Sequence, residues 1–252
     1  MQVHHIALSR AQLDRVPSDE RRLLILLAHA ANELNVLVKL FHFSIAAIST
    51  GAPSIFEQAH NAQAMVLGRI LTGKIYEWWE LMQSAFFGAG VSKIYEPQFE
   101  PEARKAIDAL KRYFRRDTII RLVRNKFAFH YSPDQIDAGY GALIEGDPLD
   151  SYISKHNANT LYAFAESITG RAMLDAINSN DHKAAFGQLI DDTSKAVSEI
   201  GDVTGQIMAI CFERHLGGNF YSLGAKVIEV QGAPESQKVA IPYFIEIESG
   251  DV

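Results

Sequence analysis

Residues 122–133 read LVRNKFAFHYSP, and this short stretch decides how the rest of the chain is interpreted. Its leucine, valine and two phenylalanines are typical of a helix that packs against a core. Among them stand Arg124, Asn125 and His130, and charged side chains are rarely buried without a partner. The helix is therefore predicted to bury its apolar side chains while a second face presents these polar groups to a cleft.

The local sequence also predicts where this helix ends and what charge surrounds it. Pro133 disfavours helical geometry at Ser132, so the helix is expected to stop near Tyr131. Residues 104–126 carry nine basic and two acidic side chains, a net of +7, whereas the whole chain carries −6 and the remainder therefore −13. An acidic protein has gathered its positive charge in one segment, which is typical of a surface that meets a polyanion.

The composition indicates an ordinary globular protein of 252 residues, 48% of them apolar. A single cysteine, Cys211, excludes an internal disulfide and fits a reducing compartment. The start lacks the continuous apolar core of a secretory signal, and the run LLILLAHAA is interrupted before it reaches the length of a membrane span. We expect a soluble, cytoplasmic protein with no membrane segment.

The apolar periodicity and the Gly and Pro positions predict a mainly α-helical protein. Ser54 is expected to cap the second long helix and Pro101 to open the basic one. Glycines and prolines between residues 139 and 148 predict a loop. The expected helices cover residues 18–49, 54–87, 102–131, 162–178 and 182–215, with a break near residue 117 and a short helix from residue 133.

The C-terminal tail changes to β-branched and aromatic residues. The segments AKVIEV (225–230) and KVAIPYFIEI (238–247) predict a hairpin, in which Pro242 confines the second strand to an edge. The resulting architecture is an antiparallel helical bundle with a small C-terminal β-hairpin. It divides into an N-terminal arm (1–17), the bundle (18–216) and the β appendage (217–252).

Arg124 and His130 together have the chemistry for cleaving RNA. An arginine grips a phosphate bidentately and stabilises the charge that it gains in the transition state. A histidine can take or give a proton near neutral pH. Their spacing alone is weak evidence, since Arg22 and His29 form a similar pair. On a straight α-helix, two residues six positions apart point about a third of a turn away from each other rather than to one face. For Arg124 and His130 to reach one phosphate, the helix must bend or end near His130, or the two residues must come from different copies of the chain.

Two other constellations compete with this interpretation. Glu57 and His60 share a helix face, as in carboxylate-bridged metal bundles, but the sequence offers no second pair at that spacing. Cys211 and His215 are one helical turn apart, which can activate a thiolate. More simply, Glu57 and His60 are expected to be polar side chains on the surface, and Cys211 a small apolar side chain packed in the core.

The stretch RNKFAFH resembles the Arg-x(4–6)-His signature of the HEPN superfamily, and the two long helices and basic helix before it fit the same pattern. The resemblance covers roughly residues 18–140. It implies a helical bundle that pairs as a homodimer through the motif helix, and a metal-independent endoribonuclease of toxin–antitoxin, phage-defence or RNA-processing type. It implies Arg124 and His130 as the catalytic pair and Asn125 as the polar residue beside the arginine.

From this resemblance and the basic composition we expect single-stranded RNA as the substrate, an antitoxin as a further partner, and neither a metal nor another cofactor. The expected RNA-binding residues are Arg115, Arg116, Arg121, Lys126 and Tyr131. Two alternatives stay open: a non-catalytic homodimer that binds RNA, a nucleotide or a protein, and an unrelated helical metalloenzyme.

Overall fold

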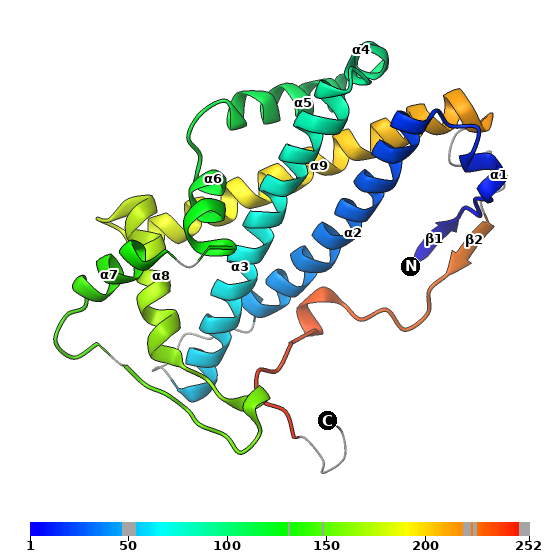
Figure 1. Cartoon of the computed structure of the whole chain (residues 1–252). Helices are drawn as coiled ribbons and strands as arrows, with labels where there is room; N and C mark the ends of the chain where they lie inside the picture. The colour runs from blue at the N-terminus through cyan, green and yellow to red at the C-terminus, as the bar shows by residue number, and fades with distance from the viewer. Residues whose placement is uncertain (47–53, 131, 148, 219–222, 224–225, 247–252) are drawn as a thin grey trace. The chain divides into compact units, whose positions relative to one another are not determined.

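The computed structural model of the chain describes residues 1–46, 54–130, 132–147, 149–218, 223 and 226–246 (Figure 1). The protein is mainly helical and carries a small two-stranded antiparallel sheet, as the sequence predicts in outline. The predicted end of the first long helix and Tyr131 lie outside the described residues.

Three long helices dominate the chain: α2 (Ser18–Ala46), α3 (Ile55–Leu81) and α9 (His182–Leu216). The predicted cap at Ser54 is confirmed. Glu57 N donates to Ser54 Oγ at 3.3 Å, and Ser54 N donates to Glu57 Oε2 at 2.9 Å. This reciprocal capping box satisfies two backbone donors that the first turn of a helix leaves open. Beyond Leu81 the helix continues as a π-helical segment, Met82–Gly88.

The chain forms two compact units, and each long helix contributes residues to both. Unit 1 comprises Met1–Asn35, Lys74–Thr118 and Ser194–Pro234, and unit 2 comprises Val36–Gly73, Ile119–Thr193 and Glu235–Val252. Unit 1 also contains α1 (Arg10–Leu13), α4 (Ser92–Tyr95) and α5 (Pro101–Phe114). Unit 2 also contains α6 (Ile119–Val123), α7 (Pro133–Gly141) and α8 (Ala163–Asn178).

Aromatic side chains build much of the core of unit 1. The rings of Trp79 and Phe114 stack with their centroids 4.8 Å apart, which joins α3 to the end of α5. Phe86 packs against Tyr95 and Phe99 in the same unit. Helix α5 begins at Pro101, as predicted, and buries one apolar stripe while its basic residues lie on the opposite face.

The sheet differs from the predicted C-terminal hairpin. Strand β2 (Lys226–Glu229) pairs antiparallel with β1 (Gln2–His5) at the other end of the chain, with Gln2 opposite Glu229 and His5 opposite Lys226. Residues 238–246 form no strand. Their backbone is instead held by Asn159, whose side chain accepts from Ile245 N at 2.9 Å and donates to Ile245 O at 2.6 Å. A side chain satisfies the polar groups that the hairpin would have paired.

Helices α7 and α8 pack closely in unit 2. The segment expected to be a loop from residue 139 instead stays helical through Gly141, so that part of the prediction is wrong. A Cβ on Gly139 would lie 2.5 Å from the carbonyl oxygen of Ile168 and 2.8 Å from Ala172 Cβ. Gly139 therefore sets how near the two helices can approach.

Within the described residues, one helix has the length and apolar character to cross a membrane. Residues Ser18–Ile45 reach a mean hydropathy of 1.5, and 22% of that window is buried in the protein. The core helix of a globular protein and a signal sequence satisfy the same two criteria. The expectation of a chain without a membrane span therefore stays a prediction.

Replacing Gly139 by alanine should destabilise the protein by about 1–3 kcal/mol, because a backbone carbonyl on α8 cannot move away as a side chain can. Gly205→Ala is the matched control. Gly205 is an exposed glycine of α9 whose added Cβ would meet no atom within 4 Å, and alanine should stabilise the helix there by about 1 kcal/mol. Urea unfolding of both variants measures the two effects, and a gain of stability in Gly139→Ala would contradict the close packing.

Candidate functional site

The helix that carries the predicted catalytic pair ends earlier than expected. Regular α-helix stops at Val123, residues Arg124–Ala128 form a π-helical segment, and Phe129 and His130 are no longer helical. Segments of π-helix are rare in proteins, and those that occur often lie at functional sites. The predicted extension to Tyr131 is therefore wrong, and the phase difference expected for a straight helix does not apply to Arg124 and His130.

Two apolar side chains anchor this segment in the core of unit 2. Val123 and Phe127 are buried in one cluster with Ala172, Met173 and Leu189. They are four residues apart and turn the same side of the segment inward. Phe127 packs in the core, and the polar residues between the two anchors face outward, as the sequence predicts.

Gly73 of α3 lets the end of the segment lie directly against that helix. A Cβ at this position would stand 2.6 Å from the ring of Phe129 and 3.0 Å from Ala128 Cβ. Glycine costs about 1 kcal/mol against alanine inside a helix, and the close approach explains why it is tolerated here. The backbone just before His130 is thereby fixed against α3.

The predicted catalytic residues lie at or near the protein surface. Arg124 is half-buried and its Nη1 donates to Asn125 Oδ1 at 3.1 Å. Asn125, Lys126 and His130 are exposed. The hydrogen bond orients the guanidinium, and the segment from Arg124 to His130 presents a cation, an amide and an imidazole to solvent.

The residues predicted to bind RNA belong to two different units. Arg115 and Arg116 are exposed at the end of α5 in unit 1. Arg121, half-buried on α6, and Lys126 belong to unit 2 with the catalytic pair. The structure thus groups Arg121, Arg124, Lys126 and His130 in one unit.

At the alternative metal site, Glu57 already has a structural role. Glu57 forms the capping box of α3 and is buried rather than a polar surface residue. Its neighbour His60 is half-buried one turn along the helix. Among the described residues, no group of three or more histidine, cysteine, aspartate or glutamate side chains gathers at metal-binding distance.

In the core of unit 1, His215 pairs with Glu20 rather than with Cys211. His215 Nε2 lies 2.7 Å from Glu20 Oε2, and Tyr95 Oη donates to the same oxygen at 2.5 Å. Cys211 is buried, and burial raises the pKa of its thiol, so it is held as an unreactive thiol. The interpretation of Cys211 as a core residue is confirmed.

Glu20 is the charged centre of this network. Burial alone would raise the pKa of its carboxyl, but hydrogen bonds from Tyr95 and His215 and the positive charges of His215 and Arg214 outweigh burial and hold that pKa below its ordinary value. Burial and the hydrogen bond to Glu20 together raise the pKa of Tyr95. The hydrogen bonds from Tyr95 and His215 thus satisfy the Glu20 carboxylate within unit 1.

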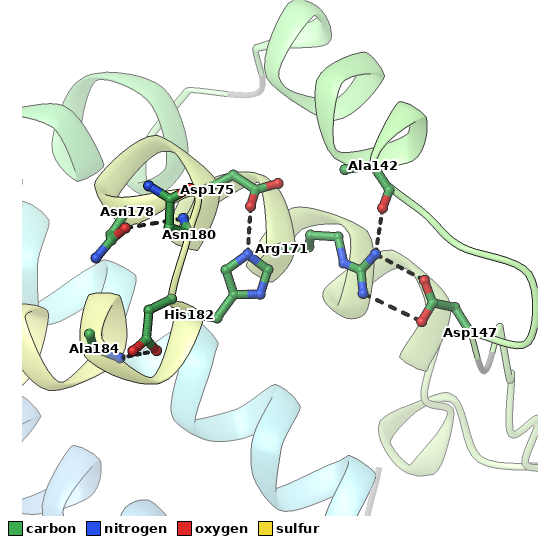
Figure 2. Close-up of polar contacts among 9 residues, drawn as sticks. Ala142, Asp147, Arg171, Asp175, Asn178, Asn180, His182 and Ala184 are labelled. Atoms are coloured by element: carbon green, nitrogen blue, oxygen red, sulfur yellow. Dashed lines mark hydrogen bonds and ion pairs between the residues drawn. The ribbon is translucent and has the colours of Figure 1, made fainter.

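Unit 2 also contains a cavity that the sequence does not reveal. It has a volume of about 530 Å³ and is lined by α3, by α8, by the start of α9 and by residues 143 and 147. Charged and polar side chains stand around it, and Figure 2 shows two of their pairs, Arg171 with Asp147 and His182 with Asp175. No local sequence pattern indicates this cavity, because the residues that line it come from separate elements.

The lowered pKa of Glu20 predicts a stability that depends on pH. The stabilising contribution is present above the unfolded pKa of about 4.3 and is lost as the pH falls through the lower folded value. Glu20→Gln should therefore reduce the free energy of unfolding by about 2 kcal/mol at pH 7 and by progressively less below pH 4. Chemical unfolding across this pH range measures the difference.

The matched control is Glu213→Gln, because Glu213 is an exposed glutamate on α9. It should change stability little at any pH. An equal loss for Glu20→Gln at pH 7 and at acidic pH would show that the charge of Glu20 contributes nothing.

Comparison of the chain with family models, with curated proteins and with solved structures finds no match.

Proposed function

We propose that the segment Arg124–His130 is the active site of an endoribonuclease that cleaves single-stranded RNA without a metal ion. The observation that carries the proposal is the early end of the helix at Ala128. It puts His130 on exposed, non-helical backbone shortly after the half-buried Arg124. A histidine in that position is reachable by a chain of RNA and free of the fixed spacing of an α-helix.

The reaction is an internal transesterification. The ribose 2′-oxygen attacks the neighbouring phosphorus, the bond to the 5′-oxygen breaks, and the products are a 2′,3′-cyclic phosphate and a 5′-hydroxyl. His130 takes the proton of the 2′-hydroxyl or gives one to the leaving oxygen. Arg124 holds the phosphoryl oxygens as they gain charge, and Asn125 orients its guanidinium. The need for a 2′-hydroxyl restricts the activity to RNA.

Neighbouring side chains supply the contacts that a single strand of RNA requires. Lys126 is exposed next to the pair and can neutralise a phosphate. The ring of Phe129, 43% exposed beside His130, offers a face on which an unpaired base can stack. Arg121 adds charge in the same unit, and Arg115 and Arg116 extend the basic segment along the chain.

The HEPN resemblance adds a second copy of the chain to this proposal. In that superfamily two motif helices meet along a cleft, so the proposed enzyme is a homodimer in which the exposed motif segments face each other. An antitoxin that covers this cleft would silence the enzyme. The proposal thus assigns the segment a catalytic and a pairing role at once.

Purified protein should cleave single-stranded RNA in the presence of EDTA and leave 2′,3′-cyclic phosphate ends. His130→Ala should reduce the rate about a thousandfold, because general acid–base catalysis contributes on that order. Arg124→Ala should reduce it at least about a hundredfold through lost transition-state stabilisation. Gel analysis of labelled RNA measures the rates, and circular dichroism checks that the variants fold.

The controls are Arg22→Ala and His29→Ala, a pair of similar spacing that is exposed on α2. Both should keep full activity. Full activity in Arg124→Ala or His130→Ala would exclude the mechanism, and loss of activity with EDTA would point to a metal enzyme. Binding of RNA without cleavage by the unmodified protein would replace the enzyme with the non-catalytic alternative.

The dimer is tested by a cysteine in the motif segment. Cys211 is buried, so a new surface cysteine reports on its own surroundings. Lys126→Cys should give a disulfide-linked dimer under mild oxidation, at about twice the 28.0 kDa mass of the chain. Lys93→Cys, an exposed position on α4, is the control and should stay mainly monomeric on denaturing gels. Equal crosslinking of both would argue against pairing through the motif.

A further inference from the structure

We infer that the cavity of unit 2 is a binding site for a small organic acid with an apolar body, held through Lys183 and His182. The proposed RNA site and this cavity share no residue among those named for either role. The two proposals can therefore fail separately.

The cavity has the size and walls of a small-molecule site. Its volume of about 530 Å³ lies within the range that ligand pockets commonly occupy. Met65, Leu143, Leu174 and Phe186 supply apolar and aromatic wall surface. A ligand that fills the space must therefore bring an apolar body.

The two carboxylates that line the cavity, Asp147 and Glu166, each pair with an arginine. Asp147 Oδ2 lies 2.9 Å from Arg171 Nη1. Glu166 accepts from Arg69, which is 8% exposed, at 2.9 and 3.2 Å. Lys183 also lines the cavity, and among the described residues no carboxylate lies within ion-pair distance of it. Lys183 is therefore the cation of the cavity lining that remains to pair with the head group of an anion.

His182 adds a second group that can meet an anion. Its Nε2 lies 2.5 Å from Asp175 Oδ1. Figure 2 draws this contact, in which an ionised carboxylate can only accept. The proton is thus on Nε2, and the pair fixes the orientation of the ring. Nδ1 accepts a hydrogen bond in the neutral ring and donates one in the protonated ring.

An ion pair holds one wall of the cavity in place before any ligand arrives. Arg171 donates to the carbonyl oxygen of Ala142 at 2.5 Å and pairs with Asp147, at the two ends of the segment that carries Leu143 (Figure 2). Both groups are mostly buried, so the fork of the guanidinium fixes this segment against α8. A preformed wall lowers the ordering cost of binding.

Isothermal titration calorimetry with the whole protein tests the site with four probes. Phenylpropionate and phenyl phosphate combine an aromatic body with an acidic group, phenylpropanol lacks the charge, and inorganic phosphate lacks the body. We expect saturable binding of at least one acid, with phenylpropanol and inorganic phosphate each at least about tenfold weaker. The tighter of the two acids identifies the class of head group.

Paired variants locate the binding. Lys183→Met should weaken the acid about tenfold, whereas Lys195→Met, which removes an exposed lysine of the same helix, should not. Ser167 is exposed at the cavity, so Ser167→Trp should block it, while Ala176→Trp places the same side chain elsewhere on α8. The site is overturned if neither acid binds, if phenylpropanol binds equally well, or if each variant matches its control.

Discussion

The burial of Val123 and Phe127 in unit 2 is the constraint on which the candidate site depends. Because both side chains enter one core cluster, the residues between them must turn outward. Gly73 then allows Phe129 and Ala128 to lie against α3 at the point where the helix ends. Apolar packing thus presents Arg124 and His130 to solvent without burying an unpaired charge.

The same core connects the motif segment to the cavity. Met65 and Leu174 pack against the cluster that holds Val123 and Phe127, and both also line the cavity. The apolar cluster that anchors the motif segment therefore also supports one wall of the cavity. In unit 1, by contrast, the buried Glu20 receives hydrogen bonds from Tyr95 and His215, which satisfy its charge within the protein.

The helical part of the fold could be predicted because its signals are local. The Ser54 capping box and the prolines at positions 101 and 133 begin helices where the sequence indicates, and α8 and α9 agree with their expected bounds within one residue. The pairing of the C-terminal strand could not be predicted, because a run of β-branched residues does not specify which segment of the chain it pairs with. Strand β2 pairs with β1, which lies some 220 residues earlier in the chain.

By itself, the sequence determined that the protein is mainly helical, where most of its helices begin, and which residues have the chemistry to act on a phosphate. Those properties follow from backbone geometry, capping and side-chain type, which act within a few residues. Only the tertiary structure decided that His130 is exposed, that Cys211 is sealed beside Tyr95, and that Asp175 meets His182 at a cavity. Burial and pairing depend on contacts between distant elements, and no local pattern encodes them.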